Sequence, residues 1–104
     1  MKIIKCLSEK IKEELKDAET YIDLAMEWKK DEPEAADVFA ELSAEEMGHA
    51  DKLHTEITKL ISRYRETKGE PPAGMLAIYE YLHEQQIENA MRVRVKQKMY
   101  EEAE

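Results

Sequence analysis

The sequence is poor in the residues that mark several common protein classes. It contains one cysteine, so no disulfide bond can form within a chain, and no Cys-x-x-Cys pair is present for a zinc ribbon or a rubredoxin-type module. No apolar run is long enough to span a bilayer, and the first residues lack the apolar core of a signal peptide. We therefore expect a cytoplasmic protein that has no membrane partner.

Cationic residues are also in the minority. The chain has 16 Lys and Arg against 24 Asp and Glu, a formal net charge of -8 at pH 7 that disfavours nucleic acid and anionic lipid as partners. Glycine and proline number three each, while hydrophobic residues make up 42%. That combination favours helices over disorder. We expect one all-α domain over residues 1–104, with a modest core that association completes.

A first helix is predicted over about residues 8–30. Its inner positions follow at alternating intervals of four and three residues, the pattern of a helix packed in a bundle. They are Leu7, Ile11, Glu14, Ala18, Tyr21, Ala25 and Trp28, so Glu14 is the one charged residue among them. Residues 29–33 predict a tight turn that ends with Pro33 in the first turn of the next helix. So short a connection makes the two helices antiparallel.

A second helix is predicted over about residues 33–65, with the same alternation. Its inner positions are Ala35, Phe39, Leu42, Glu46, His49, Leu53, Glu56 and Leu60. Three of these residues are polar: Glu46, His49 and Glu56. Residues three apart project from one side of a helix, so Glu46 and His49 face the same way.

Residues 66–74 form the clearest break in the chain, where Gly69 can cap the second helix and two prolines force an extended backbone. A third helix is predicted over about residues 75–101. Its apolar face is less regular, and residues 92–98 are basic while the first two helices are acidic. We expect this basic segment to dock on an acidic surface, in the same chain or in a neighbour.

The predicted hairpin places Glu14 level with Glu46 and His49. Charged groups in a dry interior persist when they are paired or bound to a metal. Two such hairpins facing each other supply four Glu and two His, the ligand set of carboxylate-bridged di-iron bundles. Oxygen-rich ligation with some imidazole suits iron or manganese better than structural zinc. The alternative is a buried Glu–His pair with a structural role only.

Residues 13–54 resemble the metal-binding hairpin of the ferritin-like superfamily, especially rubrerythrins and the short encapsulated ferritins. The family pattern is a Glu followed seven residues later by a Tyr on one helix, then Glu-x-x-His-Ala on the next. This sequence has Glu14 with Tyr21, then Glu46-Met-Gly-His49-Ala. The resemblance implies Glu14 and His49 as terminal metal ligands, Glu46 as a bridging ligand, and Tyr21 as a nearby phenol with a redox or catalytic role.

The resemblance also implies an assembly. The chain has one such hairpin, so a complete four-helix bundle and its di-iron centre require a homodimer or a higher homo-oligomer, as in the encapsulated ferritins. Iron is the implied cofactor, and manganese is an alternative.

Several other residues have two interpretations. Tyr21 can equally be a packing residue, and Glu56 either extends the site or marks the solvent end of the bundle. A group on the third helix is either a second metal cluster or an exposed acidic patch: Glu80, His83, Glu84 and Glu88. We expect His54 to be exposed and Cys6 to serve as a small apolar residue.

Two functional hypotheses follow. The first is a di-iron protein, for which the family resemblance implies ferroxidase-type oxidoreductase activity with O2 or peroxide, in iron handling or oxidative stress. The missing rubredoxin module disfavours a complete rubrerythrin-type peroxidase in this chain. The second is a non-enzymatic helical oligomerisation module, whose metal site is structural or vestigial and whose basic third helix is the docking surface.

Overall fold

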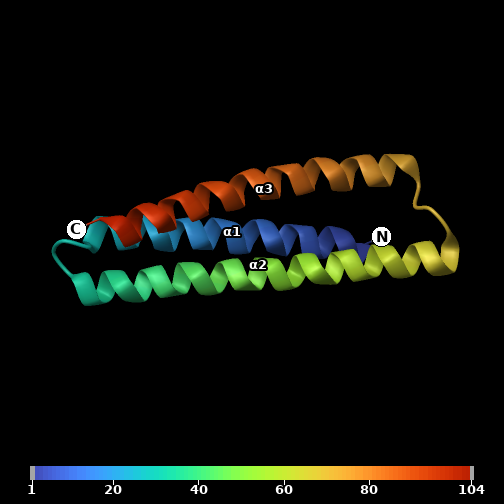
Figure 1. Ribbon diagram of the computed structural model, residues 1–104. Coiled ribbons are helices and arrows are strands. Elements are labelled where there is room, and N and C mark those ends of the chain that lie inside the picture. Colours follow the sequence, from blue (N-terminus) through green and yellow to red (C-terminus); the bar gives the residue numbers. More distant parts are fainter. Residues whose placement is uncertain (1, 104) are drawn as a thin grey trace.

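A computed structural model describes residues 2–103 and contains three long helices. These are α1 (Lys2–Trp28), α2 (Pro33–Lys68) and α3 (Ala73–Glu102), and no strand occurs in residues 2–103. The helices run side by side in a rod of 56 × 18 × 18 Å (Figure 1). The all-α prediction is confirmed. No helix within residues 2–103 combines enough length and hydrophobicity to cross a membrane.

The helix ends differ from the prediction by a few residues. α1 begins at Lys2 instead of residue 8 because Ile4 and Leu7 pack partly against the core and extend the helix. It ends at Trp28, whose carbonyl oxygen accepts a hydrogen bond from the N–H of Glu32 across the turn. α2 continues to Lys68, and Gly69 then adopts φ +84°, a conformation that favours glycine. The N–H of Gly69 donates to the carbonyl oxygen of Arg65, which confirms the predicted cap.

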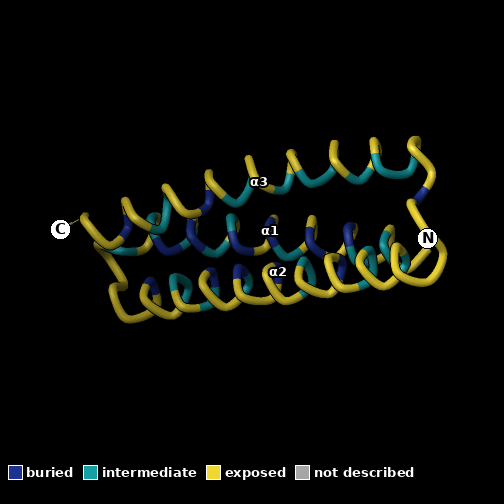
Figure 2. The backbone as a smooth tube through the Cα atoms, turned by 45° about the vertical axis from the view of Figure 1, so that its right-hand side comes forward, coloured by how far each residue is buried: buried dark blue, intermediate teal, exposed yellow. Residues whose placement is uncertain are grey.

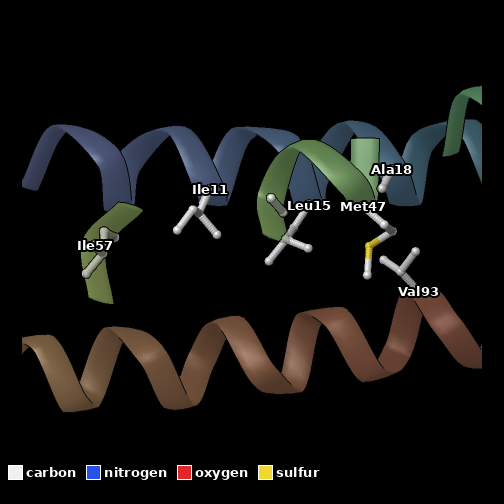
Figure 3. Close-up of a cluster of buried hydrophobic side chains, with 7 residues drawn as sticks. Ile11, Leu15, Ala18, Met47, Ile57 and Val93 are labelled. Atoms are coloured by element: carbon white, nitrogen blue, oxygen red, sulfur yellow. The ribbon is translucent and has the colours of Figure 1, made fainter. Parts of the chain in front are cut away.

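α1 is the central helix of the fold and packs on both of the others. A large cluster of buried side chains joins all three helices (Figure 3); it contains Ile11, Leu15, Ala18, Met47, Ala50, Ile57 and Val93. A smaller cluster lies nearer the α1–α2 turn and contains Ile22, Ala25, Ala36 and Tyr100. α2 and α3 share few contacts, so α3 is held mainly through α1.

The buried side of α2 is rotated from the predicted one. Its buried residues are Ala36, Ser43, Met47, Ala50 and Ile57. All five lie one position beyond a predicted inner residue, which corresponds to a rotation of about 100° around the helix. The predicted inner positions Ala35 of α2 and Trp28 of α1 are wrong, because Ala35 is exposed and Trp28 is 41% exposed. α3 packs on one side of α1, and the large buried cluster, which includes Val93 of α3, lies toward that side.

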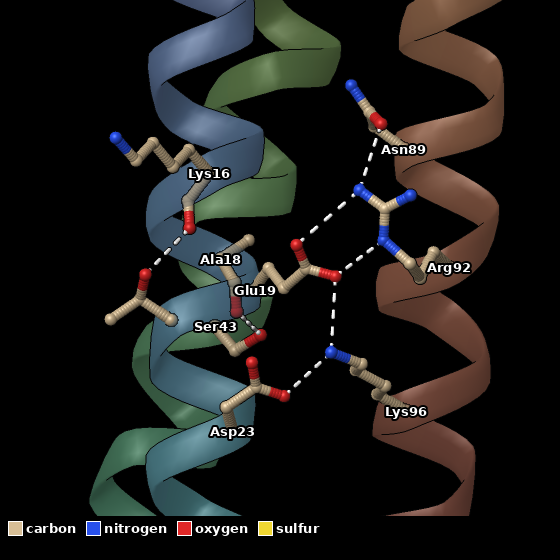
Figure 4. Close-up of polar contacts among 9 residues, drawn as sticks. Lys16, Ala18, Glu19, Asp23, Ser43, Asn89, Arg92 and Lys96 are labelled. Atoms are coloured by element: carbon tan, nitrogen blue, oxygen red, sulfur yellow. Dashed lines mark hydrogen bonds and ion pairs between the residues drawn. The ribbon is translucent and has the colours of Figure 1, made fainter.

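Charged side chains dock the basic half of α3 onto α1. Arg92 donates to both carboxylate oxygens of Glu19, and Lys96 bridges Glu19 and Asp23 at 3.2 and 2.8 Å (Figure 4). The hydrogen bond from Arg92 holds the pKa of Glu19 below its ordinary value. The hydrogen bond to Asp23 raises the pKa of Lys96. The prediction that this basic segment docks on an acidic surface is confirmed, and that surface belongs to the same chain.

Buried polar groups also connect the three helices by hydrogen bonds. Ser43 of α2 donates from Oγ to the carbonyl oxygen of Ala18 at 2.7 Å and accepts from Nε2 of Gln97 at 3.0 Å. Near the end of α3, the hydroxyl of Tyr100 donates to Asp37 of α2. Burial first, and then this hydrogen bond, raises the pKa of Tyr100 to about 12. Its ring packs in the smaller buried cluster.

Candidate metal centre

The three predicted metal ligands converge between α1 and α2. Nδ1 of His49 lies 3.6 Å from Oε2 of Glu14 and 3.7 Å from Oε2 of Glu46. One donor atom from each of the three residues lies within 4.8 Å of the others. Such a group of two carboxylates and one imidazole is small enough for one cation to contact all three.

Local sequence explains why these side chains meet. The short turn after Trp28 makes α1 and α2 antiparallel, so residues at similar distances from the turn lie at the same level. One helical turn from Glu14, the backbone of Ala18 accepts the hydrogen bond from Ser43. Both residues are small and fully buried. Their contact brings the two backbones close together beside the carboxylates.

The three side chains were expected to lie in a dry interior, and for the single chain this expectation is wrong. The side chain of His49 is 58% exposed, while those of Glu14 and Glu46 are 26% and 17% exposed. The reason is the rotation of α2, which leaves its predicted inner line at the edge of the hairpin. The three donors therefore form an open cluster on the outer side of the α1–α2 pair.

This open side is not purely polar. Half-buried apolar side chains extend along it in both directions from the donor group; they are Tyr21, Leu24, Phe39, Leu42, Leu53 and Leu60. The rings of Tyr21 and Phe39 stack with centroids 6.4 Å apart. This stacking agrees with the interpretation of Tyr21 as a packing residue. The redox role of Tyr21 stays a prediction.

Glu56 does not join the donor group. It is exposed and lies two helical turns beyond His49, about 10 Å along α2. The three donors are thus the whole group within residues 2–103.

The third-helix candidates do not form a second donor cluster in the described part of the chain. Glu80, Glu84 and Glu88 are exposed, as the acidic-patch interpretation requires. His83 instead stacks on His54 of α2, with ring centroids 4.7 Å apart. Burial, followed by the nearby His54, lowers the pKa of His83.

His54 was expected to be exposed. This prediction is wrong, because α3 covers His54 and leaves it only partly exposed. The sequence carried no periodic signal that would pair the two histidines, because α2 and α3 meet only through the tertiary packing. Cys6 is exposed and not an apolar packing residue, because it projects away from the side of α1 on which Ile4 and Leu7 pack against the core.

Comparison with protein-family models, with curated proteins and with solved structures found no match for this chain.

Proposed function

We propose that this chain is a ferritin-like di-iron carboxylate protein that binds iron between α1 and α2 and completes its site by dimerisation. The observation that carries the proposal is the approach of Glu14, Glu46 and His49 to within 4.8 Å of one another on the open side of the hairpin. All three residues match the family motif, and they come from two helices separated by a turn.

The exposure of the cluster favours a shared site. Iron and manganese take more ligands than the three that one chain offers, and oxygen donors dominate among them. A second copy of the same face would add two carboxylates and one imidazole, for a total of four Glu and two His. The half-buried apolar residues beside the cluster would then be covered, which supplies a hydrophobic contribution to pairing.

In this arrangement Glu14, Glu46 and His49 of both chains would hold the metal, in the roles that the family resemblance implies: Glu46 as the bridging ligand, and Glu14 and His49 as terminal ligands. Bound iron would supply the one-electron chemistry, with two ferrous ions giving two electrons to O2 or peroxide. The protein's part is to hold oxygen and nitrogen donors in place and to cover the site with apolar side chains. The activity expected is ferroxidase-type oxidation.

Anaerobic titration with ferrous ammonium sulfate, followed by admission of air, tests the proposal. We expect about one iron per chain, as two per dimer, and a near-ultraviolet ferric absorption band after oxidation. Glu46→Ala and His49→Ala should abolish both. At a ferrous concentration about 100 times Kd, binding should raise the free energy of unfolding by about 2.7 kcal/mol in the unsubstituted chain alone.

Two matched controls separate ligation from general charge loss. Glu13 and Glu45 are the exposed neighbours of Glu14 and Glu46 on the same helices. Glu13→Ala and Glu45→Ala remove the same charge and should load iron normally. Normal iron loading by Glu46→Ala and His49→Ala would reject the site.

A non-enzymatic oligomerisation module is the second candidate. The observation that favours it is the set of exposed hydrophobic side chains on α3, which includes Met91 and Val95 at 58% and 59% exposure. Such a protein would associate through its helices with or without metal. Iron binding without oxidation in air would support this candidate over the first.

A further inference from the structure

The open side of α3 carries a heptad line that the three-helix core does not use. Residues spaced alternately by four and three share one side of a helix. Along α3 this line is Glu80, Glu84, Ile87, Met91, Arg94 and Lys98, which we name the α3 pairing face. All six residues are exposed. Figure 2 shows exposed turns along the outer edge of α3 over its whole length.

The residue types along this face are ordered. Its N-terminal third is acidic, its centre is apolar and its C-terminal third is basic. Within residues 2–103, Glu80 and Glu84 form no ion pair with a basic side chain. Arg94 reaches only an exposed contact of 4.0 Å with Asp51 of α2. Lys98 lies 3.8 Å from Glu102 of its own helix. Exposed pairs of this kind contribute little to stability.

The order makes the face complementary to itself in one orientation. When a second α3 lies antiparallel across a two-fold axis at the level of residue 89, midway between Ile87 and Met91, position 84 lies opposite 94, position 80 opposite 98, and position 87 opposite 91. Each carboxylate then meets a cation, and the two apolar side chains meet each other. A parallel pair would set each charge against its own kind, which is destabilising.

We propose that α3 pairs antiparallel with α3 of a second copy of this chain through the α3 pairing face. The contact runs from Glu80 to Lys98, about 27 Å of helix, and repeats across the two-fold axis as an isologous interface. It also covers a groove of about 210 Å³ between α2 and α3. Ile87, Met91 and Arg94 border this groove, and its floor is apolar.

This interface is distinct from the proposed iron site. α3 docks on α1 through Glu19, five residues after Glu14, which turns the two side chains about 140° apart around the helix. The iron cluster and α3 therefore lie on different sides of α1. Pairing through α3 leaves the cluster accessible, and a protein with both interfaces assembles beyond the dimer.

Charge exchange tests the pairing in the full-length chain. One variant carries Glu80→Lys and Glu84→Lys, so that every charged residue of its pairing face is basic. The other carries Arg94→Glu and Lys98→Glu, so that every charged residue of its pairing face is acidic. Light scattering after size exclusion, at low salt with a chelator present, should give half the wild-type molar mass for each variant alone. An equimolar mixture should restore the wild-type mass, because every opposed pair in the mixed dimer is attractive.

Circular dichroism of each variant checks that the helices are intact. If a variant measured by itself has lost helicity, recovery of that helicity in the equimolar mixture supports the pairing equally well. The proposal is overturned by a wild-type chain that stays monomeric at high micromolar concentration, by variants that keep the wild-type mass, or by a mixture that does not restore it. Ferrous binding should be the same in both variants, so failure of the iron site and failure of this interface give different results.

Cross-linking tests the orientation. In a Cys6→Ser background, which removes the exposed native thiol, chains with Glu84→Cys and chains with Arg94→Cys are mixed and oxidised. The antiparallel register predicts a disulfide between positions 84 and 94. Two copies of position 84 would lie about 15 Å apart, too far for a disulfide. Preferential linkage of 84 to 84 would overturn the register.

Discussion

The hydroxyl of Ser43 joins all three helices, and its removal tests most directly how α3 packs. Ser43 is fully buried, donates to Ala18 of α1 and accepts from Gln97 of α3 (Figure 4 shows the first contact). A buried hydrogen bond contributes about 0.5–1.5 kcal/mol net, and two are lost here. We expect Ser43→Ala to lower the free energy of unfolding by about 1–3 kcal/mol.

The measurement is urea unfolding followed by far-ultraviolet circular dichroism. A single protein concentration is used throughout, because association makes apparent stability depend on concentration. One kcal/mol corresponds to about 4–8 °C in the thermal midpoint for a domain near this size. Ser62→Ala is the matched control, since Ser62 is exposed on the same helix and should change stability by less than about 0.5 kcal/mol.

A double-mutant cycle isolates the link to α3. Ser43→Ala and Gln97→Ala should show a coupling of about 0.5–1.5 kcal/mol, because their side chains share one hydrogen bond. Additive effects would contradict the hydrogen bond between Gln97 of α3 and Ser43 of α2. Equal losses in Ser43→Ala and Ser62→Ala would contradict the burial of Ser43 altogether.

Three further predictions rest on other contacts. Apart from the adjoining backbone of α2, no atom of residues 2–103 lies within 4 Å of a Cβ added at Gly48, so Gly48→Ala should raise the free energy of unfolding by about 1 kcal/mol. A lower thermal midpoint would contradict the open space at this position. Ile57 has no exposed surface, so Ile57→Ala should lower the free energy of unfolding by about 2–5 kcal/mol. Ile78→Ala, at a mostly exposed position, should lower it by less than about 0.5 kcal/mol. Equal losses of stability in urea unfolding would refute the assignment of Ile57 to the core. The hydrogen bond from Arg92 lowers the pKa of Glu19, so this carboxylate stabilises the fold above the ordinary carboxyl range and loses that effect as the pH falls through the lowered value. Glu19→Gln should therefore flatten the acid side of the stability–pH curve, and an unchanged curve would refute the role of this pair.

The secondary structure was largely predictable because its signals are local. Alternating intervals of four and three identify helices, and Pro33 and Gly69 mark where α2 begins and ends. The level at which Glu14 meets His49 also followed from the chain, since the position of a short turn determines which residues lie opposite one another.

The solvent exposure of the site could not be predicted in the same way. The periodic line through Glu46 and His49 was expected to be buried, and His49 is more than half exposed. Periodicity identifies the apolar stripe of a helix, but where that stripe is wide the neighbouring helices decide which part of it becomes core. In α2 the part nearer α3 was buried, and Met47 and Ile57 occupy it.

The sequence by itself determined the three helices, their turns, the donor group of Glu14, Glu46 and His49, and the order of charges along α3, because these depend on intervals along one chain. Only the tertiary structure decided that α3 docks on α1 through Glu19, that the donor group opens to the outside, and that His54 stacks on His83. Each of these depends on where α3 lies, and α3 is placed by contacts between residues more than twenty positions apart. No local pattern records such contacts.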